Sequence, residues 1–443
     1  MTVLLMVGTS IGLFYLNRSL IFEQKTSANQ LRSTTAQEVA EAGLEWAIGM
    51  LNAPYDIDTN CNLLSTTNVS FRRRYVQSQW FGSPASTNVV PVENVHPGCK
   101  ISGTTLTCSC PNLPSSGTAV ASLGTAVLPS FTVAFTPVPT DPSNYAGAKD
   151  EEAVQVTAYG CTASANACAP GTATSATGPD AVAVVTAIVK FRPVLRAGPA
   201  AALTCGGYCQ PGGSYNIVNT DPSTNGITIN AGSTISVVQG AATATIPGLP
   251  PANAQVANDS SLAALYTGDT TCSNSSMFQA YFGSTIEQYA AAPSTKSISC
   301  TSANTCGSAV NTAYNEGWRS FYFPQGFWLN NSAPFSQLGT LADPVTIVTP
   351  GDFDINGNIV INGLVFSNSA SLNDFGTGTA DIVGAVIVCG NQKSNGNGTI
   401  RYDPSVLKNN RRSTALAVPV NGSWSDSLCA LPVGNPRRPS TGC

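Results

Sequence analysis

The chain opens on a long apolar run. Residues 1–17 (MTVLLMVGTSIGLFYLN) carry no charge, and the first charged residue is Arg18. As a helix, such a run spans about 25 Å, close to the hydrocarbon thickness of a bilayer. Residues 19–22 extend it to a full crossing if Arg18 snorkels to the interface. No basic region precedes the run and no small-residue cleavage site follows it, so we expect a chain whose leader has been removed rather than a secretory signal peptide.

The helical pattern continues well beyond this run. Residues 23–51 contain no proline and are rich in helix formers, and Pro54 is the first stop signal. We therefore predict one helix from residue 1 to about 52, roughly 80 Å long. One apolar face consists of Ala28, Leu31, Thr35, Val39, Ala42, Trp46 and Met50, and a second of Leu44, Ala47, Ile48 and Leu51. A helix that is apolar on two sides needs two partners, so we assign one face to its own globular domain and the other to neighbouring subunits.

After Pro54 the hydrophobic pattern changes from helical to alternating. Phe131, Val133 and Phe135 alternate with smaller residues, and the segments 153–159 and 181–191 show the same period. Strands joined mostly by turns favour an antiparallel sheet, whose apolar face is expected to cover the C-terminal half of the helix. Residues 160–178 read as an exposed loop, and residues 194–202 as a linker with a domain boundary near residue 198.

A different repeat begins after residue 200. Ile361 and Gly363 align with Ile382 and Gly384 at an offset of 21 residues, and Asn and Gly lie at the expected corners. A period near 20 with short strands is typical of a β-solenoid, in which each rung buries its apolar side chains against the next. A stack of ordinary hairpins is the alternative.

These patterns predict an α+β protein of three parts. A transmembrane or filament-core helix covers residues 1–53, and an antiparallel sheet domain packed on that helix covers residues 54–198. A β-solenoid-like domain covers residues 199–443, with a helical insertion at about 255–340 that includes the helical pattern of residues 260–291.

Composition narrows the possible functions. The 443 residues are 10% charged and 42% hydrophobic, with a net charge of −4 and one histidine. This balance argues against a nucleic-acid partner and against a long disordered tail. A single His96 also excludes metal sites built on several histidines and disfavours a Ser-His-Asp triad.

Fourteen cysteines indicate an oxidising compartment. Cys108 and Cys110 lie close in sequence, but no pair has the Cys-x2-Cys spacing of a zinc site, so we favour disulfides over a zinc or iron–sulfur cluster. The disulfide candidates are Cys161, Cys168, Cys205, Cys209, Cys300, Cys306, Cys389 and Cys429. Their connectivity stays open at this point.

Two further motifs have a candidate chemistry. Asp352, Asp354 and Asn356 match the first half of a calcium-binding loop, although Gly363 stands where the bidentate Glu belongs. A corner of the repeat is the preferred interpretation, so we expect no cofactor, with Ca²⁺ as the weak alternative. The run Arg72–Arg74 is interpreted as a solvated edge, because a DNA-binding patch does not fit the net charge.

The N-terminal segment resembles type IV pilins and the pseudopilins of type II secretion. Residues 1–5 (MTVLL) are similar to the start left by prepilin peptidase, and residues 36–45 (AQEVAEAGLE) resemble the signature of PilX-like pilus assembly proteins. Residues 345–358 (VTIVTPGDFDINGN) resemble an element of their C-terminal β-helical region. The chain departs from major pilins at Leu5, where they carry Glu, and this favours a minor or tip-proximal subunit.

The resemblance implies a pilin αβ-roll and assigns roles to the apolar run. Met1 is the expected site of N-methylation, and Gly8 and Gly12 form a G-x-x-x-G pattern that permits close helix approach. The polymerisation residues are Met1, Leu4, Leu5, Gly8, Gly12, Leu13 and Leu16. The implied partners are copies of itself or other pilins, the inner-membrane pilus assembly machinery, and the membrane before assembly.

The resulting hypothesis is a structural one. We expect a non-catalytic subunit of an extracellular type IV pilus-like filament, held in the bacterial inner membrane before assembly and found on the cell surface afterwards. The alternatives are a pilus-tip adhesin that binds a glycan or a surface, and a type II secretion pseudopilin. A polysaccharide-active enzyme ranks last, because Asp352, Asp354, Asp374 and Asp381 offer no clear pair of carboxylates.

Overall fold

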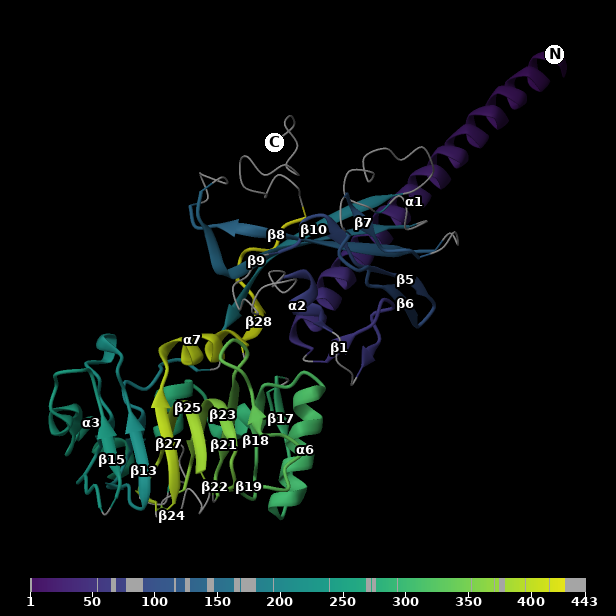
Figure 1. The fold of residues 1–443 in the computed structure, drawn as a ribbon. Coiled ribbons are helices and arrows are strands. Elements are labelled where there is room, and N and C mark those ends of the chain that lie inside the picture. Colours follow the sequence, from purple (N-terminus) through teal and green to yellow (C-terminus); the bar gives the residue numbers. More distant parts are fainter. Residues whose placement is uncertain are drawn as a thin grey trace.

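A long helix and two separate sets of sheets make up the computed structural model (Figure 1). The structure describes residues 2–53, 55–64, 69–76, 91–114, 117–123, 128–141, 147–162, 168, 181–193, 195–238, 240–267, 272, 276–292, 294–351, 353–369, 371–373, 379–394, 396–413 and 415–426. The N-terminal helix leans on the first set of sheets and extends away from it, and the second set lies below (Figure 1).

Helix α1 spans Thr2–Asn52, close to the extent that the sequence predicts. Its described side chains are exposed up to Thr34, and burial starts at Ala36. Met1 lies outside the described residues. For Leu4, Leu5, Gly8, Gly12, Leu13 and Leu16 the structure gives a helical backbone only, so the predicted polymerisation contacts lie outside its description. In the part of the chain described, no helix is apolar over a length sufficient to cross a membrane.

The C-terminal half of α1 packs on the sheet through a face that contains residues of both predicted apolar faces. Its buried hydrophobic residues repeat at helical spacing and are Ala36, Val39, Ala40, Leu44, Ala47 and Leu51. This set combines Val39 of the first predicted face with Leu44, Ala47 and Leu51 of the second, while Leu31 and Ala42 of the first face are exposed. The close contacts of Gly160 with Ala36 and Ala40 decide which side of the helix faces the sheet, and the hydropathy of the helix alone does not identify that side.

The sheet beneath α1 is antiparallel and six-stranded, in the order β28-β10-β9-β8-β5-β6. Its strands are β5 (Gly98–Ser102), β6 (Thr105–Ser109), β8 (Ser130–Pro139), β9 (Lys149–Cys161), β10 (Val182–Arg192) and β28 (Leu416–Pro419). Phe131, Val133 and Phe135 lie in its core with the buried face of α1. Around it lie β1 (Asp56–Ile57), β2 (Leu63–Leu64), β3 (Val69–Ser70), β4 (Val95–His96), β7 (Ala119–Val120) and the short helix α2 (Phe71–Tyr75).

The second half of the chain is built on a parallel twelve-stranded sheet. Its main path is β15 (Ala242–Ala244), β13 (Ser214–Val218), β27 (Asn397–Tyr402), β25 (Thr379–Val388), β23 (Val360–Ser367), β21 (Val345–Thr349), β18 (Ser320–Tyr322) and β17 (Thr295–Ser297). Off this path lie β11 (Leu203–Cys205), β14 (Ile229–Ala231), β16 (Gln255–Val256) and β20 (Gln337–Leu338).

Two smaller parallel sheets and several short helices complete this half. The sheets are formed by β12 (Cys209–Gln210), β26 (Asn391–Lys393) and β24 (Ser371–Asn373), and by β19 (Phe327–Asn330) and β22 (Phe353–Asn356). The helices are α3 (Ser260–Thr267), α4 (Ser276–Phe282), α5 (Ile286–Ala290), α6 (Ala303–Asn315) and α7 (Pro404–Ser413), with 3₁₀ turns η3 (Pro222–Thr224) and η4 (Pro251–Ala254).

The repeat read from the sequence appears as strand register. Ile361 pairs with Ile382 and Gly363 with Gly384, which confirms the offset of 21 residues. Both glycines have positive φ, and a Cβ on Gly384 would lie 2.0 Å from the Gly363 carbonyl oxygen. Each strand therefore bends at the same level as its neighbour, because only glycine fits so close to the adjacent backbone.

Three boundaries differ from those expected. The helical insertion is not continuous, because β17, β18 and β19 interrupt it; over 260–291 the described residues form the short helices α3, α4 and α5. Residues 416–425 return to the antiparallel sheet, since β28 pairs with β10. The predicted linker is packed at Leu195, which is buried among aromatic residues of α4. Each difference depends on contacts between segments far apart in the sequence.

Six disulfides join twelve cysteines of the described residues. Cys161–Cys168, Cys205–Cys209 and Cys300–Cys306 close short loops, as their proximity in the sequence suggests. Cys108 and Cys110 bond to different partners, Cys99 and Cys61. Cys389 bonds to Cys272, 117 residues away, and Cys429 lies outside the described residues.

Substitution of Gly160 tests how closely α1 approaches the sheet. A Cβ there would lie 2.2 Å from the Ala36 carbonyl oxygen and 2.4 Å from the Ala40 nitrogen, both backbone atoms that cannot move separately. We expect Gly160→Ala to lower the free energy of unfolding by about 1–3 kcal/mol or more. The matched control is Gly49→Ala, which meets no atom within 4 Å and should raise stability by about 1 kcal/mol. Thermal unfolding that changes equally in both variants contradicts the contact.

Removal of the longest disulfide tests what holds the second half together. Replacing both Cys272 and Cys389 by Ala frees a loop of 117 residues, and chain entropy predicts a loss of about 5 kcal/mol. The same change at Cys205 and Cys209, which lie four residues apart, should cost only about 2 kcal/mol. Denaturant unfolding of the two double variants checks the order, and a reversed order contradicts the pairing.

Candidate functional site

The exposed stretch of α1 is the first candidate. Phe22 is 73% exposed and Leu31 is 69% exposed, although both are large apolar side chains. Among the described residues between them, every side chain is exposed. An isolated helix gains little stability in water from propensity alone, so a stretch with this exposure is expected to find a partner.

Close packing fixes the direction in which this stretch points. Gly160 of β9 lies directly under Ala36 and Ala40 of α1, and Gly43 of α1 lies against the ring of Phe131. Trp46 then contacts the same ring at a centroid distance of 5.4 Å. Small residues on both elements thus bring helix and sheet together from residue 36 onward, and the exposed stretch begins where this docking ends.

The interpretation of Arg72–Arg74 as a solvated edge is wrong for two of its three residues. Arg72 and Arg74 are buried in α2. Arg72 Nε donates to the Leu51 carbonyl at 2.8 Å, and its guanidinium lies 4.8 Å from the Phe191 ring centroid. Burial, with Arg73 beside it, lowers the pKa of Arg72 to about 10, so the group stays charged at neutral pH.

Arg74 completes the attachment of α2. Its guanidinium donates to the carbonyls of Ile57, Asp58 and Cys110, at 2.6, 3.2 and 3.3 Å. Backbone carbonyls thus satisfy the buried donors, which is why the charge is tolerated inside. The flanking aromatic residues of α2 were the only local signal of this burial, since Phe71 and Tyr75 are fully buried.

The middle arginine links the two halves of the molecule. Arg73 of α2 hydrogen-bonds to the buried Asp343, which also accepts from Arg319 Nε at 2.9 Å. Arg319 in turn lies 3.9 Å from the Tyr314 ring centroid. Burial alone raises the pKa of Asp343, but Arg73 and Arg319 outweigh it and hold the pKa at about 2. One carboxylate therefore holds an arginine from each half.

The C-terminal strand provides a second link. Asn52 at the end of α1 donates to the Ala417 carbonyl at 2.9 Å and accepts from the Ala417 nitrogen at 2.8 Å. These residues are 365 positions apart in the sequence. The chain thus leaves the first half after β10, builds the parallel sheets and returns to close against its first helix.

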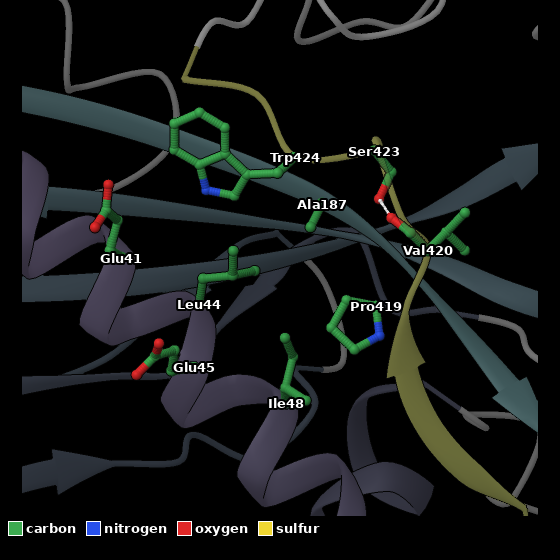
Figure 2. A pocket seen from close by; sticks show the side chains of 9 residues that line it. All are labelled: Glu41, Leu44, Glu45, Ile48, Ala187, Pro419, Val420, Ser423 and Trp424. Carbon is green, nitrogen blue, oxygen red and sulfur yellow. Dashed lines mark hydrogen bonds between the residues drawn. The ribbon is translucent and has the colours of Figure 1, made fainter.

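A cavity lies where this returning strand meets α1 (Figure 2). Its volume is about 410 Å³, and its lining comes from α1, from Ala187 of β10, and from the end of β28 and the segment after it. Leu44 and Ile48 face Pro419 across it, Glu41 and Glu45 lie along its side, and Trp424 leans over one end (Figure 2). It is an apolar pocket with an acidic side; the described lining contains no nucleophile–base pair.

The predicted calcium residues lie on a strand rather than in a loop. Asp354 and Asn356 belong to β22, and the Asn356 Nδ2 donates to Asp354 Oδ2 at 2.8 Å. Phe353 and Ile355 of the same strand are buried in the core, and Asp352 lies outside the described residues. Across the described ranges, no three His, Cys, Asp or Glu side chains are grouped so as to hold a metal ion.

Comparisons with known proteins add little. No family model and no curated protein matches the chain. A search of solved structures finds the crystal structure of the competence-associated pilin ComZ from Thermus thermophilus, with 11% identity over 89% of this chain and 97% of that one, and a TM-score of 0.19. A TM-score this low does not establish a shared fold.

Because of the Arg73–Asp343–Arg319 cluster, we expect the free energy of unfolding to fall at acidic pH. The pKa of Asp343 is lower in the folded protein than its ordinary value of 3.8, so its stabilising contribution is complete above about pH 4 and is lost as the pH falls toward 2. We expect Asp343→Asn to destabilise the protein by roughly 3–5 kcal/mol at pH 7, because it leaves two arginines without their counter-charge.

The difference between wild type and Asp343→Asn should shrink as the pH falls from 4 to 2. Denaturant unfolding at several pH values measures it. The control is Asp426→Asn, because Asp426 is exposed and lies outside the cluster. A difference that does not change between pH 4 and 2 contradicts the role given to the Asp343 carboxylate.

Proposed function

We propose that this chain is a structural subunit of a type IV pilus-like filament that polymerises through α1. The observation that carries the proposal is the change in exposure along this continuous helix at Ala36. Its C-terminal part is docked on an antiparallel sheet, and the described part before it is exposed on all sides. The exposed part continues the uncharged run of residues 1–17, so one continuous rod is available for contacts with other copies.

The same helix supports a membrane-held state before assembly. Its backbone is hydrogen-bonded internally, so lipid tails and neighbouring helices are both acceptable surroundings for its apolar side chains. We propose that the subunit waits in the bacterial inner membrane, is moved into the filament by the pilus assembly machinery, and then lies on the cell surface. The disulfides are consistent with exposure to an oxidising compartment.

For the second half we propose a β-solenoid that faces away from the filament core. Its support is the in-register parallel pairing from β13 through β27, β25 and β23 to β21 and the bends shared by Gly363 and Gly384. Stacked rungs and disulfides give resistance to unfolding, which an exposed filament component needs. Leu5, together with this large second half, favours a minor or tip-proximal place over that of a major subunit. We assign the chain no catalytic step.

A charge introduced into the apolar run tests the proposal. In the full-length chain expressed in its bacterial host, we expect Leu13→Arg and Leu16→Arg to abolish recovery of the subunit in sheared surface filaments. The physical reason is that a charge in a helix bundle or in lipid costs several kcal/mol.

The control is Ser27→Arg, at an exposed position outside the run. It should leave incorporation unchanged, and the melting temperature of each purified variant shows whether the sheet domain is still folded. Normal incorporation of both leucine variants contradicts polymerisation through this helix.

A further inference from the structure

One face of the exposed helix carries a basic and aromatic pattern. Arg18, Lys25 and Arg32 are spaced seven residues apart, which is close to two helical turns and about 10.5 Å along the axis. Phe22 lies on the same face, one turn after Arg18. All four side chains are exposed, and within the described residues none of the three cations is ion-paired.

The cavity beside the docked half of α1 has the opposite character. Glu41 and Glu45 lie one turn apart along its side, and neither forms an ion pair with any described residue. Leu44, Ile48 and Pro419 provide an apolar floor, and Trp424 is 52% exposed at its end (Figure 2). Its volume of about 410 Å³ is enough for a phenylalanine side chain.

We infer that this cavity receives the exposed helix of a second copy of the chain. Phe22 of one copy would enter between Leu44, Ile48 and Trp424 of the next, with Lys25 beside Glu41 or Glu45. On each helix the apolar group and the charge lie within one turn: Lys25 is three residues from Phe22, and Leu44 is three residues from Glu41 and one from Glu45. Opposite charges would set the register of the two helices, and the buried ring would exclude water.

This inference rests on the proposed function, because it supplies the contact outside the apolar run through which neighbouring subunits recognise each other. It requires a head-to-tail arrangement. The basic face belongs to the exposed half of α1 and the cavity to the docked half, so each copy offers one of each and the contact repeats along a filament.

A photo-crosslinking experiment tests the contact. The full-length protein carries p-benzoylphenylalanine in place of Phe22, and filaments are irradiated, reduced, digested and analysed by mass spectrometry. We expect crosslinks to peptides that contain Leu44, Ile48 or Trp424. The matched control places the same group at Ser27, which is exposed on the opposite side of the helix and should not label the cavity.

Charge reversal provides an independent measurement. Lys25→Glu with Arg32→Glu should lower incorporation into filaments roughly tenfold, as should Glu41→Lys with Glu45→Lys, while the fourfold variant should recover most of it. If either pair of substitutions acted only by disturbing the fold of the subunit, combining the two pairs would not restore incorporation.

The outcomes separate the inference from the proposed function. Filaments that form with Phe22 crosslinked only to lipid, to another protein or to a different surface of the subunit overturn the inference and leave the proposed function standing. No recovery in the fourfold variant also overturns it. If the wild-type chain does not enter filaments at all, both are overturned.

Discussion

The close approach of α1 to β9 is the contact on which the rest of the structure depends. Gly160 has no room for a Cβ under Ala36 and Ala40, and Gly43 has none against Phe131. Because these contacts involve α1 only from Ala36 onward, they divide the helix into a docked part and an exposed part. The exposed part is what makes a filament subunit a reasonable function.

The second constraint is the way in which the two halves are joined. Asp343 binds arginines from both, and Asn52 holds the returning strand at Ala417. In a chain with so few charges, placing one carboxylate between two arginines gives a specific contact, since a misaligned pair would leave a buried charge unpaired. Force applied to the second half would therefore pass to α1 through defined contacts rather than through a free linker.

Local patterns in the sequence predicted the local features of this fold. The extent of α1 followed from the absence of proline, the strands β8, β9 and β10 from alternation, and the register of Ile361 with Ile382 from a repeat. The contacts that define the candidate site could not be predicted in this way. Burial of Arg72 and Arg74, the partner of Cys389 and the return of β28 each depend on residues tens to hundreds of positions away. Only Phe71 and Tyr75 around the arginines carried a local signal.

Hydrogen exchange of the amides of residues 22–34, measured in the isolated subunit and in the assembled filament, tests the central claim most directly. The exposed helix has no tertiary partner within the described monomer, so its amides should exchange quickly there and become strongly protected in the filament. Protection that is already complete in the isolated subunit, or exchange that stays fast in the filament, would contradict a helix that polymerises by contact with other copies.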